Sequence, residues 1–228
     1  MSIWSRITLA LSALSKGDGL ATVFDHLRTP PERSVAFTIA VIALSAKMAK
    51  ADGLVTKDEV TAFREVFYIP ASDLPQAARV FNLARQDVSG FELYAKNISR
   101  MFGHGNPVLN DLMEGLFYIA SADGKYHPNE DRFLFEVAAQ FGLKEVDFQA
   151  LRARHVPEEK PDPYTVLGVS AKQDFDQIKT IWRQLVRESH PDQMIARGVP
   201  KEAIKLAERR LIQINAAYEK IAKAQVAP

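Results

Sequence analysis

Prolines and glycines punctuate almost every apolar segment of this chain, and this pattern restricts it to helices. The 12 prolines and 11 glycines fall mainly at the ends of segments whose apolar residues recur every three to four positions, the period of an amphipathic α-helix. No run of β-branched residues alternates with polar ones for long enough to predict a strand. We therefore expect an all-α protein. The predicted helices cover residues 3–15, 33–51, 57–67, 73–87, 91–102, 107–122, 128–141, 144–154, 163–167, 175–189 and 200–222.

One break in the helical pattern divides the chain. The segment Pro-Glu-Glu-Lys-Pro at residues 157–161 interrupts the periodicity, and a length of 228 residues allows one large domain or two small ones. We expect a helical domain over residues 1–156, with its core at about 30–150 and an N-terminal helix at 3–15. The linker at 157–161 would then lead into a second helical domain over residues 162–228.

Composition argues against several classes of function. The absence of cysteine rules out disulfides, thiolate zinc sites and cysteine nucleophiles. A net charge of +1 creates no broad field for nucleic acid, so we expect no nucleic-acid partner. The apolar run at 35–46 is shorter than the ~18–20 residues of a membrane span, which predicts a helix buried at the centre of a soluble domain. A homodimer through the 33–51 helix stays open, as does contact of residues 3–14 with a membrane surface.

The first domain contains an internal repeat. Residues 49–59, AKADGLVTKDE, align with residues 120–130, ASADGKYHPNE, at an offset of 71 positions. Gly53 and Gly124 suit the left-handed backbone conformation that follows a helix end. Each copy therefore predicts a helical hairpin that folds back through an Asp-Gly turn. A pseudo-two-fold pair of such hairpins would bury the first helix of each against the other.

Four carboxylates accompany the repeat: Asp52, Glu59, Asp123 and Glu130. In one interpretation the aspartates accept hydrogen bonds from turn amides and the glutamates complete helix caps. In the other, the four gather at one end of the bundle and hold a hard divalent cation, which prefers oxygen ligands. Their spacing lacks the alternating acidic pattern of a calcium-binding loop. We therefore adopt the capping interpretation and expect no metal or cofactor, and the cation site remains the alternative.

Two helices of the second domain predict an antiparallel hairpin with a basic outer face. Each helix carries an apolar stripe: Ile178, Ile181, Trp182 and Leu185 on the first, and Ala207, Leu211, Ile214, Tyr218 and Ile221 on the second. Three basic residues recur every four positions on the side away from the first stripe, namely Lys179, Arg183 and Arg187. We expect Tyr164 and Leu167 of the short 163–167 helix to close the base of this hairpin.

The tripeptide His190-Pro191-Asp192 stands between these two helices. Pro191 cannot continue a helix, and it biases His190 towards an extended conformation. We expect an exposed turn at the tip of the hairpin, followed by a loop at 195–200. A general base needs an oriented partner and a pocket that excludes water. An exposed turn offers neither, so we expect no enzyme activity.

Both halves of the chain resemble known families. The repeat with its Asp-Gly turns resembles the TerB-like domain, a helical module of tellurite-resistance proteins and some co-chaperones, over residues 30–150. In that family acidic residues near the turns are linked to metal binding. The Tyr-Leu-Gly helix, the basic helix, the His-Pro-Asp turn and the later segment INAAYE together resemble a J-domain of the DnaJ type, over residues 161–224. The combination is similar to co-chaperones of the DjlA-like type.

The resemblance implies a binding function. In J-domains the His-Pro-Asp turn triggers ATP hydrolysis by a DnaK-type chaperone of the heat-shock 70 family, and the basic helix pairs with acidic surface on that chaperone. Carried over to this chain, the trigger is His190-Pro191-Asp192 and the docking ridge is Lys179, Arg183 and Arg187. The first domain would provide targeting or select clients, whose identity the sequence does not indicate.

Two departures from the resemblance affect these expectations. DjlA-like proteins have an N-terminal membrane span, and we expect none here, so the protein is expected in the cytoplasm, at most peripheral at the inner membrane. Gln193 stands where J-domains commonly have lysine, which would weaken docking slightly. The alternative function is a TerB-like metal-ion or stress-response binding protein in which the J-domain is accessory.

Overall fold

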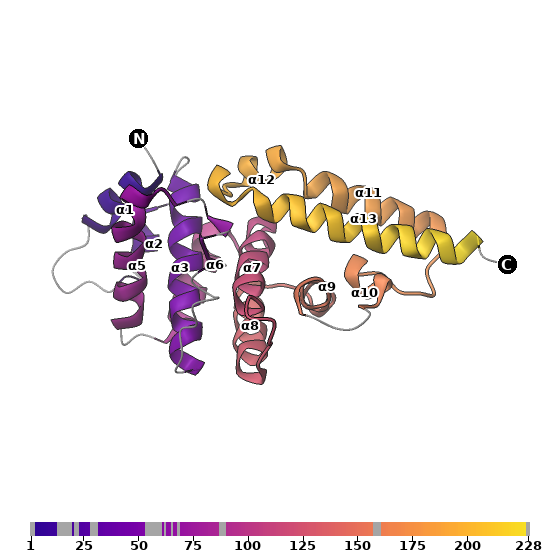
Figure 1. Ribbon diagram of the computed structural model, residues 1–228, viewed down its shortest axis with the longest axis horizontal. Coiled ribbons are helices and arrows are strands. Elements are labelled where there is room, and N and C mark those ends of the chain that lie inside the picture. Colours follow the sequence, from indigo (N-terminus) through magenta and orange to yellow (C-terminus); the bar gives the residue numbers. More distant parts are fainter. Residues whose placement is uncertain are drawn as a thin grey trace.

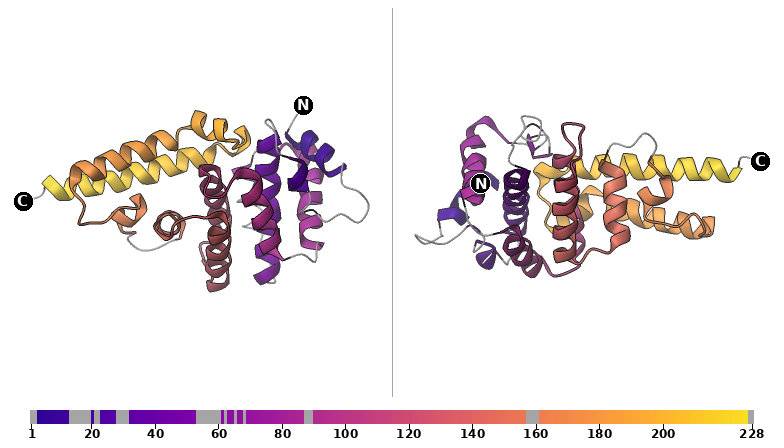
Figure 2. Two further views of the ribbon diagram at one scale, coloured as in Figure 1. Left: turned by 180° about the vertical axis from the view of Figure 1, so that it is seen from behind. Right: turned by 90° about the horizontal axis from the view of Figure 1, so that it is seen from below.

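The computed structural model shows an upright helical bundle with a long helical hairpin projecting from its side (Figure 1). Within the residues it describes, the protein is all-α and contains no strand, as predicted. The two further views show the same arrangement from behind and from below (Figure 2). The described residues are 3–12, 20, 23–27, 32–52, 61, 63–64, 66–67, 69–86, 90–156 and 161–226.

Helix α3 (Glu32–Asp52) is the centre of the bundle. Every side chain from Val35 to Ala49 is buried, which confirms the prediction from the apolar run. Such a helix must be covered on all sides. Its neighbours are α1 (Ile3–Ser12), α5 (Leu74–Gln86), α6 (Phe91–Phe102), α7 (Pro107–Ala120) and α8 (Pro128–Phe141).

The second copy of the repeat folds much as expected. Helix α7 packs against α3, so the first helices of the two hairpins are buried together. Gly124 has the predicted left-handed backbone, with φ of +77°. Helix α7 ends at Ala120, two residues earlier than predicted, and a turn leads into α8. The first Asp-Gly turn and most of the predicted 57–67 helix lie outside the described residues.

Short elements complete the bundle. Sequence periodicity did not predict the four-residue helix α2 (Val23–His26), which is too short to show a period. A 3-10 turn η2 (Ala71–Asp73) precedes α5, and α9 (Glu145–His155) follows α8. Helix α9 packs against both α7 and α10 (Pro163–Leu167), and in Figure 1 it lies between these two helices and below α13.

The projecting hairpin consists of α11 (Phe175–Glu188) and α13 (Lys205–Val226), which lie side by side. Trp182 and Tyr218 stack with ring centroids 4.1 Å apart, and the indole Nε1 of Trp182 donates to Asn215 Oδ1 at 2.9 Å. The small core of the hairpin also takes in Tyr164 and Leu167, which confirms that α10 closes its base.

Two expectations about the end of the hairpin nearest the bundle are wrong. Residues 191–197 form a helix, α12 (Pro191–Arg197), where a turn and the start of a loop were expected; a proline that ends one helix can occupy the first position of the next. The predicted 200–222 helix splits into the 3-10 turn η3 (Lys201–Ala203) and α13. Ala207, which was assigned to the hairpin stripe, instead joins the core of the bundle, together with Met194, Val199, Ala203 and Leu206.

Candidate functional site

Helix α11 presents the three basic residues that the sequence singles out. Asp174 caps its N-terminus by accepting from the amide of Asp176 at 3.0 Å, and Ile178 is buried against α13 and α10. Anchoring on this apolar side leaves the opposite side to solvent. Arg183 and Arg187 are exposed and Lys179 is half-buried. We call Lys179, Arg183 and Arg187 the basic ridge.

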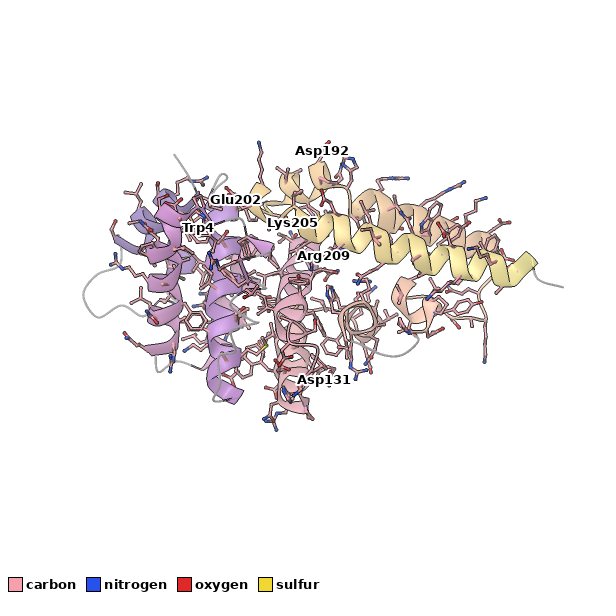
Figure 3. All side chains as sticks on the ribbon, in the orientation of Figure 1. Trp4, Asp131, Asp192, Glu202, Lys205 and Arg209 are labelled. Carbon is pink, nitrogen blue, oxygen red and sulfur yellow. The ribbon has the colours of Figure 1, made fainter. Side chains whose placement is uncertain are left out.

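The His-Pro-Asp motif lies at the junction of α11 and α12. His190 has an extended backbone, with φ −64° and ψ 135°, and it is the N-cap of α12, while Pro191 is the first helical residue. The side chains are exposed, 58% for His190 and 85% for Asp192. Asp192 lies at the outer edge of the molecule (Figure 3). The predicted exposure of this motif is therefore confirmed, although the motif begins a helix and is not an isolated turn.

One hydrogen bond orients the imidazole of His190. Its Nδ1 accepts from the amide of Asp192 at 3.2 Å, so the proton of the neutral ring is on Nε2. The motif therefore presents an N–H donor on His190 and a carboxylate acceptor on Asp192 to solvent. Both groups are exposed, without the enclosure that general acid–base chemistry requires.

Helix α12 holds the motif in place from the buried side. Met194 and Val199 are buried in the core of the bundle. Arg197, the last residue of α12, donates from Nη1 to the main-chain oxygen of Glu188, the last residue of α11, at 2.9 Å. The same guanidinium pairs with Asp111 of α7. Arg197 therefore connects both helices that flank the motif to the bundle.

The carboxylates of the second repeat make the contacts that capping predicts. Asp123 Oδ1 accepts from the amide of Lys125 at 2.8 Å, and Glu130 Oε2 accepts from the amide of His127 at 2.8 Å. Over the described part of the chain, no three acidic or histidine side chains are grouped in a way that could hold a metal ion. Glu59 and the side chain of Asp52 lie outside that part.

The sequence patterns did not predict a buried ionic cluster that lies beside this site. It consists of the carboxylates Asp111 and Glu114 on α7 with the basic side chains Arg154, His155, Arg197 and Arg210. The feature that could have revealed it is the pair of acidic residues, three positions apart, inside the otherwise apolar run of α7. A buried carboxylate needs a cationic partner, but the spacing alone does not say which one.

Comparison with protein families identifies both halves of the chain. The family described as tellurite resistance protein TerB matches residues 38–153, and the DnaJ domain matches residues 162–225. The latter range contains the basic ridge and the His-Pro-Asp motif. Neither match is to an enzyme family. No solved structure matches the chain significantly.

Several curated relatives share both halves. The co-chaperone protein DjlA of Salmonella paratyphi A is 25% identical over 97% of this chain and 97% of its own length. Those of Photobacterium profundum and Haemophilus ducreyi are 26% and 24% identical, over 91% and 84% of this chain and 84% and 80% of their own lengths. None of the helices in the described ranges has both the length and the apolar character that crossing a membrane requires.

Proposed function

We propose that this chain, which belongs to the TerB family and also contains a DnaJ domain, stimulates ATP hydrolysis by a DnaK-type chaperone. It shares this two-domain composition with the DjlA co-chaperones that it resembles. The trigger is His190-Pro191-Asp192. The basic ridge guides docking, and the N-terminal domain targets the protein or selects clients. The observation that carries the proposal is the exposed His-Pro-Asp motif, which lies at the end of the basic helix and within the DnaJ match.

Charge supports the role of the ridge. Arg183 and Arg187 are exposed one helical turn apart, and Arg187 lies three residues before His190. Complementary charge speeds encounter and fixes the register of docking more than it adds affinity. A chaperone with acidic surface would therefore meet the ridge first and the motif immediately beyond it.

The deciding experiment compares two His→Gln variants. His190→Gln removes the trigger imidazole and should abolish stimulation of ATP hydrolysis by the DnaK-type chaperone of the same organism, in single-turnover measurements. His127→Gln is a matched control, because His127 is also an exposed helix N-cap followed by proline, at the start of α8. This control should stimulate as the unaltered protein does. Full stimulation by a folded His190→Gln protein would refute the assignment.

The ridge is tested by its salt dependence. Arg187→Ala should raise the concentration needed for half-maximal stimulation. The half-maximal concentrations of this variant and of the unaltered protein should become more similar as salt rises from about 0.1 to about 1 M, because the Debye length then falls from about 10 to about 3 Å. Arg132→Ala, at an exposed arginine of α8, is the control and should leave stimulation unchanged. A loss in Arg187→Ala that is independent of salt would contradict electrostatic docking.

A further inference from the structure

The buried ionic cluster joins the two halves of the chain next to the His-Pro-Asp motif. Its two carboxylates, Asp111 and Glu114, are 0% and 1% exposed and belong to α7 of the bundle. Buried carboxylates must be paired with cations, and here the cations come from α9, α12 and α13. Figure 3 shows Arg209, the neighbour of Arg210 in sequence, where α13 crosses α7. The pairs made by Arg197 and Arg210 therefore lie at the contact between bundle and hairpin, whereas Arg154 and His155 connect α9 to α7.

The two carboxylates have different partners. Asp111 accepts two hydrogen bonds from Arg197, from Nε to Oδ2 and from Nη2 to Oδ1, each at 3.0 Å. Glu114 pairs with Arg154 at 3.3 Å and with His155. Arg210 bridges the two, with Nη1 2.9 Å from Asp111 and Nε 3.1 Å from Glu114. Only Asp111 is therefore connected directly to α12.

The third nitrogen of the Arg197 guanidinium, Nη1, contacts the segment that precedes the motif. Nη1 donates to the main-chain oxygen of Glu188 at 2.9 Å. Glu188 lies two residues before His190, and Arg197 lies five residues after Asp192. The guanidinium of Arg197, the last residue of α12, thus binds both the end of α11 and a buried carboxylate of the bundle. A lysine could not make all of these contacts, because its ammonium is a single point charge.

The residue that follows α12, Gly198, also lies close to helix α3 of the bundle. A Cβ added to Gly198, directly after Arg197, would lie 2.8 Å from Cβ of Arg33 on α3. The backbone of Gly198 has a φ of +110°, which other residues rarely adopt. The end of α12 is therefore fitted to α3 as well as to α7, independently of the ion pair.

We propose that Arg197 is a positioning residue for the His-Pro-Asp motif and that Asp111 of the N-terminal domain anchors it. The N-terminal domain then sets the geometry of the trigger, in addition to any role in targeting. This inference rests on the proposed function for its consequence in ATP hydrolysis. Its structural part is independent of that function, and the test keeps the two apart.

The test uses Asp111→Asn and Arg197→Lys, with Glu114→Gln as the matched control. Asp111→Asn and Glu114→Gln each replace a buried α7 carboxylate by its amide, but Arg197 is paired with Asp111, whereas Glu114 is paired with Arg154, His155 and Arg210. Glu114→Gln should destabilise the fold at least as much, since Glu114 pairs with two arginines and with His155. It therefore controls for general loss of stability. Arg197→Lys keeps the positive charge beside Asp111 and remains informative if Asp111→Asn does not fold.

The first measurement needs no chaperone. The amide of Ser189 donates to Leu185 O, and the amides of Gln193 and Met194 donate to His190 O. Hydrogen exchange of these three amides should become about tenfold faster in Asp111→Asn and Arg197→Lys than in Glu114→Gln, as expected when one hydrogen bond that holds the segment is lost. Equal exchange in all three variants overturns the proposal, whatever the outcome for ATP hydrolysis.

The second measurement separates positioning from docking. Asp111→Asn and Arg197→Lys should lower the maximal stimulated rate of ATP hydrolysis several-fold and leave the half-maximal concentration unchanged, because the basic ridge is intact. Glu114→Gln should keep the full maximal rate. Faster exchange without any loss of maximal rate would overturn the positioning role. Failure of the unaltered protein to stimulate would refute the proposed function and leave the exchange result as the test of the anchor.

Discussion

Replacing Glu114 by glutamine removes one buried negative charge and keeps the size of the side chain, while one of its two acceptor oxygens becomes an NH2 donor. Glu114 is 1% exposed and contacts Arg154, His155 and Arg210. Removal of one partner from a buried ion pair leaves an uncompensated charge and costs about 3–5 kcal/mol. Arg210 keeps Asp111 at 2.9 Å, so we expect the lower end, about 3 kcal/mol at pH 7.

The pH dependence of this loss identifies its source. Burial alone would raise the pKa of Glu114, but the positive charges of Arg210, Arg154 and His155 hold it well below its ordinary value of 4.5. A carboxyl whose pKa is depressed in the folded state stabilises the fold above its unfolded pKa. That contribution is lost as the pH falls towards the folded pKa, by about 1.4 kcal/mol per pH unit. The difference between the two proteins should therefore be full at pH 7 and shrink below pH 4.5.

Urea unfolding followed by circular dichroism at a series of pH values measures this difference. The unaltered protein should lose stability on acidification more steeply than Glu114→Gln does, because the variant has no charge to lose at this position. A difference in unfolding free energy below about 1 kcal/mol at pH 7 would refute the argument. So would a difference that stays constant between pH 4.5 and pH 3, since it could not then come from the ionised carboxylate.

Two further changes test the fold on either side of the cluster. Gly142→Ala should cost about 1–2 kcal/mol, because φ is +75° there, and the cost should exceed that of Gly124→Ala, since only at Gly142 would the new Cβ meet the His104 ring. Thermal unfolding of both variants measures this, and equal losses would contradict the His104 contact. Trp182→Leu should cost about 2 kcal/mol through the lost stacking and hydrogen bond. Unchanged urea unfolding would show that the hairpin does not depend on this pair.

Sequence patterns anticipated the elements that depend on local rules. The apolar run of α3 is long enough that only the centre of a bundle can bury it, so its position followed from composition and length. The hairpin followed from two apolar stripes at helical spacing, and the exposure of His190 and Asp192 followed from the proline between them. Helix α12 was missed because Pro191 is compatible with both the end of one helix and the start of another.

No local sequence pattern predicts which residues form ion pairs when they lie far apart in the chain. Arg197 and Asp111 are 86 residues apart, and Arg210 and Asp111 are 99 apart. Many arginines in this chain could have met those carboxylates, and the choice among them depends on how α12 and α13 pack against α7. The amino-acid order was thus enough to establish a helical protein in two parts with an exposed His-Pro-Asp motif. Which bundle residue the motif is attached to became visible only in the folded molecule, because a buried charge selects its partner by position in space.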